Sequence, residues 1–192
     1  MSDCLLRGQR VSLRPSTPEE IPQSFLWATN PDPEVQRYFY GEEIPTYQEF
    51  LEDWRPHYFD GSQPTHGRCY TILADRVTPI GVVNYNDFDA EGKRVTFDIV
   101  IGESEYLGRG YGSDALGTLV RYVFEVFPSL ETAIIGAHPE NVRAIRAYGK
   151  AGFRPVEVDV SDPYIGAYDK AAGDLVFLEL RREVLAGHPY GR

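Results

Sequence analysis

A glycine-rich turn at the start of an amphipathic helix is the feature that most constrains the fold of this chain. The β-rich run Val95–Ile101 precedes the turn, whose residues 108–112 read Gly-Arg-Gly-Tyr-Gly. From residue 112 to residue 127, apolar side chains recur every three or four positions, which is the pattern of a helix with one buried face. We therefore expect a strand, a turn and a helix in direct succession, with Pro128 ending the helix.

This turn predicts an anion site. The first N–H groups of a helix have no partner within the helix, and the helix dipole favours a negative charge beside them. Glycines let the backbone come close to phosphate oxygens. The glycine spacing of a dinucleotide-binding fold is absent, and so is the Gly-Lys-Ser/Thr sequence of a P-loop. A plain structural turn is the alternative at this point.

Strands and helices alternate along the rest of the chain. Strands are expected at residues 11–14, 69–74, 80–85, 95–101, 132–137, 154–160 and 175–180. Helices are expected at residues 17–28, 46–58, 112–127 and 141–151, and a loop at residues 161–174. The order predicts an α+β (mixed α/β) fold with one parallel crossover near the middle of the chain.

Composition narrows the class of protein. The 192 residues fit one domain, and a net charge of -10 argues against a nucleic-acid partner. No apolar stretch reaches the length of about 20 residues that a membrane span requires. The first ten residues lack the apolar core of a signal peptide, so the cytoplasm is the expected location. Cys4 and Cys69 make neither a disulfide framework nor a metal-ligand cluster, and we expect no metal.

Acidic residues are concentrated between residues 31 and 60. This segment holds eight acids and two bases, which gives it a local net charge of -6. One interpretation is a solvated helix face. The other is an acidic rim that attracts a cationic acceptor by long-range electrostatics.

A second motif lies about 30 residues after the glycine turn. Asn141 opens a predicted helix that carries Tyr148 and ends in Lys-Ala-Gly-Phe at residues 150–153. Together, the turn and this helix resemble the GNAT superfamily of N-acetyltransferases, in which an Arg/Gln-x-x-Gly-x-Gly/Ala loop binds the pyrophosphate of CoA. Leu107 stands where that family usually has Gln or Arg. Arg109 is the residue expected to supply the missing charge, with a solvent-facing side chain as the alternative.

The resemblance implies a GNAT fold, with a mostly antiparallel mixed sheet of about seven strands, a splayed parallel pair and about four flanking helices. The domain would span residues 9–181, followed by a C-terminal tail at residues 182–192. Acetyl-CoA is the implied co-substrate, and its acetyl group would pass directly to a primary amine in a ternary complex. The implied cofactor-binding residues are Val100, Ile101, Leu107, Gly108, Arg109, Gly110, Tyr111, Gly112, Ser113, Asn141, Ala144 and Tyr148.

Tyr148 and Asp98 are the residues that the resemblance assigns to catalysis. Tyr148 would protonate the departing CoA thiolate, and packing in the core is the alternative role for its ring. Asp98 interrupts an apolar strand, where a carboxylate is costly unless it is paired or faces water. The resemblance assigns it to the acceptor amine, with a structural ion pair as the alternative. Reserve candidates for the base are Glu103, Glu105 and His138.

Two further roles follow from the resemblance. A backbone N–H around Val100 or Ile101 would meet the oxyanion that develops during transfer. Asn141 would bind the amide arm of the cofactor, and it also suits the N-cap of its helix, where Asn is favoured on local grounds.

Within the superfamily, the chain is similar to aminoglycoside 6′-N-acetyltransferases and to Rim-type N-terminal acetyltransferases. The first likeness covers Asp98 before the glycine turn, and the acceptor-side segment with Glu42 and Glu43, which would bind the substrate together with Asp98. We expect a cationic small-molecule acceptor, such as an aminoglycoside or a polyamine, and a monomer or homodimer. The alternatives are an acetyltransferase for protein N-termini and a non-catalytic acyl-CoA sensor.

Overall fold

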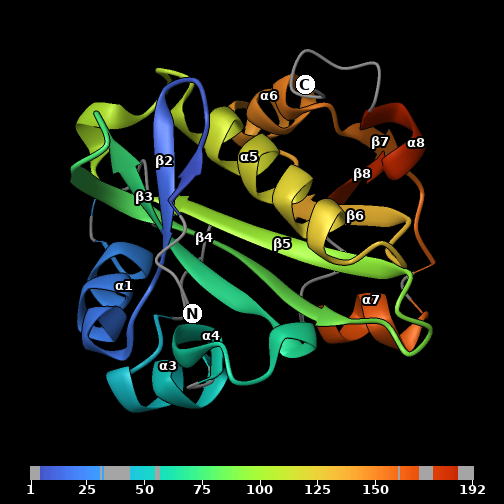
Figure 1. Cartoon of the computed structure of the whole chain (residues 1–192), viewed down its shortest axis with the longest axis horizontal. Coiled ribbons are helices and arrows are strands. Elements are labelled where there is room, and N and C mark those ends of the chain that lie inside the picture. Colours follow the sequence, from blue (N-terminus) through green and yellow to red (C-terminus); the bar gives the residue numbers. More distant parts are fainter. Residues whose placement is uncertain are drawn as a thin grey trace.

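The strands of the chain form one central sheet (Figure 1). The computed structural model describes residues 5–30, 32, 44–54, 57–159, 161–168 and 175–185. Within these ranges, eight strands lie in the order β1-β2-β3-β4-β5-β6-β8-β7. Their bounds are Leu6–Arg7 (β1), Val11–Pro15 (β2), Arg68–Ala74 (β3), Thr78–Phe88 (β4), Arg94–Ile101 (β5), Thr132–Ala137 (β6), Arg154–Val156 (β7) and Val176–Arg181 (β8).

All neighbouring strands are antiparallel except β5 and β6. The predicted mixed sheet with one parallel pair is therefore confirmed. Helix α5 (Tyr111–Val126) makes the crossover between the two parallel strands. The apolar positions that predicted this helix are fully buried against the sheet: Leu116, Leu119, Val120 and Val123.

The parallel pair is short. Pairing joins residues 94–96 of β5 to residues 132–134 of β6 and goes no further. Residues 97–101 of β5 therefore have no partner strand on that side within the described part of the chain. This is the splayed arrangement that the resemblance implies, and it leaves backbone hydrogen-bonding groups of β5 open to a ligand.

Helices cover both faces of the sheet (Figure 1). Helices α5 and α6 (Val142–Ala151) pack on one face, and α1 (Ile21–Ala28), α3 (Tyr47–Asp53) and α4 (His57–Asp60) belong to the other. Alternate residues of β5 point to opposite faces, so Phe97 joins the first core cluster and Val100 joins the second. None of the described helices is long and apolar enough to cross a membrane.

The remaining elements are short. They are the 3-10 helices η1 (Pro18–Glu20), η2 (Pro64–His66) and η3 (Ser104–Tyr106), and the helices α7 (Pro163–Tyr168) and α8 (Arg182–Leu185). Arg182, the first residue of the predicted C-terminal tail, donates hydrogen bonds to three carbonyl oxygens at the end of α5 and after it: Phe124, Phe127 and Leu130. Its guanidinium therefore caps the C-terminal end of α5.

Several predicted boundaries were wrong. The helix expected at residues 46–58 begins with the predicted capping box of Thr46 and Glu49, but α3 ends at Asp53. Trp54 leaves the helical conformation, with φ -85° and ψ 80°, and stacks on Phe50 with 4.7 Å between ring centroids. Pro56 follows in the sequence and cannot continue a helix, and α4 begins separately at His57.

Three other elements also differ from prediction. Strand β1 was missed because two residues are too few to show alternation. The strand expected at residues 154–160 pairs with β8 only as far as Val156. The loop expected at residues 161–174 contains α7, whose start is fixed by Asp162: its carboxylate accepts the N–H of Tyr164 at 2.9 Å and the guanidinium of Arg94 at 2.5 Å.

Candidate active site

The predicted glycine turn lies at the start of α5. Gly108 and Gly110 adopt positive φ angles of 72° and 88°, which glycine takes without strain. Gly110 is the N-cap of α5, and because it lacks a side chain, no capping group covers the first N–H groups of the helix. The Ser113 hydroxyl donates back to the Gly110 carbonyl at 3.0 Å and braces the turn. The turn thus presents backbone donors, as predicted.

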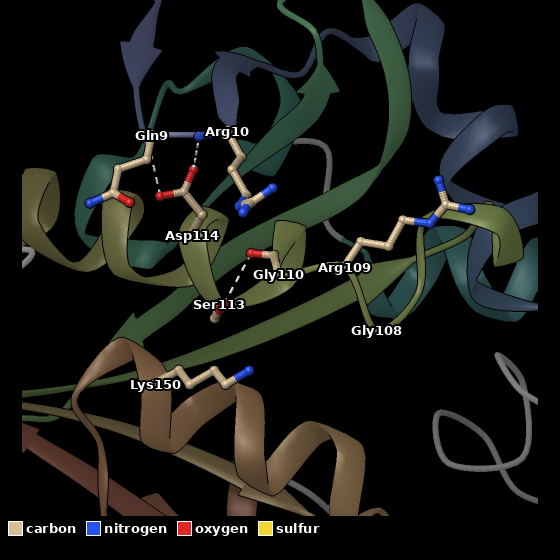
Figure 2. Close-up of a pocket in the computed structure, with 8 residues that line it drawn as sticks. All are labelled: Gln9, Arg10, Gly108, Arg109, Gly110, Ser113, Asp114 and Lys150. Carbon is tan, nitrogen blue, oxygen red and sulfur yellow. Dashed lines mark hydrogen bonds between the residues drawn. The ribbon is translucent and has the colours of Figure 1, made fainter.

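A pocket of about 350 Å³ borders this turn (Figure 2). It is lined by Gln9, Arg10, Gly108, Arg109, Gly110, Ser113, Asp114 and Lys150. Three of these side chains are cationic and one is a carboxylate, although the whole chain carries a net charge of -10. The pocket is therefore a local basic site that suits an anion.

Asp114 connects this pocket to the N-terminal hairpin. Its carboxylate is buried and accepts three backbone N–H groups, those of Gln9 at 3.1 Å, Arg10 at 2.6 Å and Val11 at 3.0 Å. The close approach requires glycine at position 8, where a Cβ would lie 2.5 Å from Asp114 Oδ2. Asp114 thus fixes the turn between β1 and β2 against the first turn of α5.

The unpaired part of β5 offers backbone donors next to this pocket. The Gly102 N–H bonds to the Ile80 carbonyl of β4 at 2.9 Å. Because N–H groups alternate in direction along a strand, that of Val100 also points to β4, whereas those of Ile99 and Ile101 point away from it. Of the two residues expected to present an N–H group to the oxyanion, Ile101 has the suitable direction.

Asp98 lies on the same strand, on the face that carries α4. The Asn86 amide donates to its carboxylate at 2.7 Å, and the Asn84 amide donates to the same oxygen at 3.3 Å. The Tyr58 hydroxyl from α4 donates to the Asn86 side chain at 3.3 Å. These contacts form a polar cluster at an otherwise apolar part of the sheet, in which neutral amides hold the carboxylate in place.

Tyr148 is buried in the first core cluster, as its alternative role required. Burial raises the pKa of its hydroxyl well above the ordinary value, and the charge of Asp98 raises this pKa further. The hydroxyl is therefore protonated at neutral pH.

Asn141 has the predicted capping role. It is the N-cap of α6, and its side chain accepts the N–H of Ala144 at 3.0 Å. Leu107 is not among the residues that line the pocket, and it packs against the second core cluster. The assignment of these residues to the cofactor stays a prediction.

The reserve candidates for the base have other contacts. Glu103 accepts the indole N–H of Trp27 at 2.8 Å. His138 belongs to a turn, where its carbonyl accepts the N–H of Asn141 at 2.8 Å, and Glu105 is exposed in η3. The predicted substrate-binding residues Glu42 and Glu43 lie outside the described residues. No group of three or more side chains that could hold a metal ion is found within the described ranges.

Sequence reasoning missed several of the polar groups at this site. Asn84 and Asn86 carried the same signal as Asp98, namely polar side chains two residues apart on one face of an apolar strand. Gln9, Arg10 and Asp114 carried no local signal, because their contacts span more than 100 residues of sequence.

A protein-family comparison agrees with this geometry. The family described as "Acetyltransferase (GNAT) domain" matches residues 10–154, which cover β2, the glycine turn and α6. The match confirms the resemblance predicted from the glycine turn and the Asn141–Phe153 segment.

Solved structures with the same fold come from enzymes with different acceptors. AAC(6')-Ib in complex with ribostamycin and coenzyme A is 21% identical, with a TM-score of 0.70, and the alignment covers 92% of this chain and 96% of that one. Spermidine N-acetyltransferase from Vibrio cholerae in complex with CoA and spermine is 17% identical, with a TM-score of 0.66 and coverages of 91% and 97%. RimL, a ribosomal L7/L12 alpha-N-protein acetyltransferase in complex with coenzyme A, is 13% identical, with a TM-score of 0.64 and coverages of 93% and 98%. At these identities the likeness shows the fold, and it confirms the predicted GNAT architecture.

Proposed function

Because the chain belongs to the GNAT acetyltransferase family, we propose that it moves an acetyl group from acetyl-CoA to the primary amine of a cationic small molecule. Membership of the family confirms the predicted enzyme class, and the acceptor is the proposed part. The observation that carries the proposal is that β5 connects two sites of opposite charge. The chain passes from the end of β5 into the basic pocket, and the Asp98 carboxylate belongs to β5 itself.

The basic pocket fits the donor. The pyrophosphate of CoA is an anion that backbone N–H groups at a helix N-terminus bind well. The turn at Gly108 and Gly110 exposes such groups, and Lys150 and Arg109 lie around them. The N–H groups of Ile99 and Ile101 face away from β4, where they can pair with amides of the pantetheine arm.

The polar cluster around Asp98 fits the acceptor. A free primary amine has a pKa of about 10 and is therefore protonated at neutral pH. It arrives as a cation and must lose a proton before it attacks. A carboxylate attracts that cation and accepts its proton. The amides of Asn84 and Asn86 hold Asp98 in one position without neutralising its charge.

The proposed transfer passes the acetyl group directly from sulfur to nitrogen. The ammonium form of the amine loses one proton to Asp98, its nitrogen bonds to the acetyl carbonyl carbon, and the bond from that carbon to sulfur breaks. The nitrogen loses its second proton as the amide forms, and this proton replaces the one that Tyr148 gives up. The Ile101 N–H stabilises negative charge on the carbonyl oxygen. Tyr148, whose pKa is raised by burial and by Asp98, gives its proton to the departing thiolate.

Thiol release from acetyl-CoA tests this function. The purified chain is incubated with acetyl-CoA and one acceptor at a time from three groups: aminoglycosides, polyamines, and peptides with free N-termini. We expect thiol release with at least one small cationic amine, and an N-acetylated product in the mass spectrum. Turnover with peptides alone would replace this proposal with an N-terminal acetyltransferase.

Binding measured in parallel separates an enzyme from a sensor. If acetyl-CoA stabilises the fold against heat but no amine of any group causes thiol release, the chain binds the cofactor without catalysis. If acetyl-CoA changes neither the thermal midpoint nor the thiol signal, the basic pocket does not serve CoA and the proposal fails.

A further inference from the structure

Arg10 lies over the glycine turn, although 98 residues of sequence separate it from Gly108. The Nε atom of Arg10 is 3.6 Å from the position that a Cβ would take on Gly110, and its Cδ atom is 3.7 Å away. Figure 2 shows the Arg10 side chain reaching from the N-terminal hairpin toward Gly110, with Lys150 on the other side of the pocket. The guanidinium is thus next to the exposed N–H groups of α5.

Hydrogen bonds to the Asp114 carboxylate fix the backbone of Arg10. Its N–H donates to Asp114 at 2.6 Å, and the N–H groups of Gln9 and Val11 donate to the same carboxylate. Because Asp114 is itself in the first turn of α5, the helix that presents the donors also positions the guanidinium. A side chain held on a fixed backbone loses less conformational freedom when it binds a ligand.

The charge of Arg10 is available to a ligand. Within the described part of the chain, its guanidinium forms no ion pair. The nearby Asp114 carboxylate is already occupied by three backbone donors. An exposed guanidinium is a planar, bidentate donor that matches phosphate oxygens.

Arg109 is placed differently. In Figure 2 its side chain leads away from Arg10 and Lys150, although its backbone belongs to the turn. The sequence predicted that Arg109 supplies the charge that Leu107 does not. The positions of the two guanidinium groups favour Arg10 for that role instead.

We propose that Arg10 is a cofactor-binding residue that donates to the pyrophosphate of acetyl-CoA. The assignment rests on the proposed function, because it requires that this pocket holds CoA. Asp114 is the positioning residue that fixes Arg10. The fold then joins two halves of one phosphate site, the N-terminal hairpin and the glycine turn.

Calorimetric titration of acetyl-CoA into wild type and Arg10→Gln tests the proposal. We expect the Kd to rise about tenfold or more, the loss typical of a charge-assisted hydrogen bond. Arg10→Lys keeps the positive charge but lacks the paired donors of the guanidinium, so its Kd should lie between those of wild type and Arg10→Gln. Arg7→Gln removes an equal charge from exposed strand β1 and should leave the Kd unchanged, and Arg109→Gln should raise it less than Arg10→Gln does.

Acetyl-dephospho-CoA, which lacks the 3′-phosphate, identifies the phosphate that Arg10 contacts. An equal Kd increase with both donors supports the pyrophosphate. An increase that disappears with the dephospho donor overturns that assignment in favour of the 3′-phosphate. Equal binding by wild type and Arg10→Gln overturns the role of Arg10 alone, whereas no binding of acetyl-CoA by wild type overturns the proposed function and this role together. Matching thermal midpoints of the ligand-free variants show that each is folded.

Discussion

The Asn86 side-chain amide donates a hydrogen bond of 2.7 Å to the carboxylate of Asp98, joining β4 to β5 on the face that carries α4. The same amide group also donates to Thr96 at 3.1 Å, and the Asn86 side-chain oxygen accepts from Tyr58. Neutral side chains of β4 therefore hold the Asp98 carboxylate in place. This arrangement is the structural basis for assigning it to the acceptor amine.

Replacing Asp98 with Asn should slow acetyl transfer about 10²- to 10⁴-fold, the usual contribution of a positioned general base. The size and many contacts of the side chain are kept, so acetyl-CoA should bind with an unchanged Kd. Steady-state kinetics and calorimetry measure the two effects separately. An Asp98→Asn enzyme with a wild-type kcat would remove Asp98 from the chemistry and leave only a structural role.

Replacing Tyr148 with Phe should lower kcat about 10²-fold while acetyl-CoA binding and the fold persist. The hydroxyl is protonated at neutral pH because its pKa is raised, so its loss removes a proton donor rather than a charge. Tyr70→Phe is the matched control, since Tyr70 is another buried tyrosine, which packs near Tyr122 of α5. Equal effects of the two substitutions on kcat would contradict the assignment.

Stability at high pH should depend on buried tyrosines. Burial is the main cause of the raised pKa of Tyr70, Tyr85, Tyr148 and Tyr164. The unfolded chain releases these protons near pH ~10 whereas the folded chain retains them, so the full stability is present below that pH and is lost above it. Each tyrosine should lower the free energy of unfolding by up to about 1.4 kcal/mol per pH unit in this range.

Urea denaturation between pH ~8 and ~11 measures this slope. Tyr148→Phe should reduce the slope of the free energy of unfolding against pH by the contribution of about one proton, because phenylalanine does not ionise. A free energy of unfolding that stays constant across the range would show that these hydroxyl groups ionise equally in both states.

Asp114→Ala should lower the free energy of unfolding by about 2–3 kcal/mol, because three backbone N–H groups lose a charged acceptor. It should also weaken acetyl-CoA binding, since Arg10 loses its fixed backbone. Gly8→Ala should have a similar effect on stability, because its Cβ would lie 2.5 Å from Asp114 Oδ2 and 2.7 Å from Thr118 Oγ1. Denaturant titration gives both values, and wild-type stability in either variant would contradict the contact.

Local patterns were sufficient to predict the parts of the site that are continuous in sequence. The three-and-four spacing from residue 112 to residue 127 predicted α5, and the glycines before it predicted the turn, in which Gly108 and Gly110 adopt positive φ angles. Asp98 was found because a carboxylate in an apolar strand is unfavourable without a reason. Asn141 was recognised as a helix start from its position and type alone.

Contacts between distant segments were outside the reach of such patterns. An aspartate in the first turn of a helix is ordinary, and nothing in its neighbourhood says that Asp114 holds the backbone of residues 9–11. The glycine turn of the phosphate site could therefore be predicted from the sequence. The position of the hairpin that carries Arg10 could not, because it depends on tertiary contacts.

The most direct measurement is acetyl transfer in a single turnover, with the chain saturated by acetyl-CoA and then mixed with the best small amine. The mass of the acceptor and the release of thiol are followed together, so binding is separated from chemistry. We predict one acetyl group on the amine for each thiol released, with rates reduced about 100-fold or more in Asp98→Asn and Tyr148→Phe. Saturation with acetyl-CoA followed by no acetylated small amine, or transfer at the wild-type rate in both variants, would contradict a transfer site built on β5 and α6.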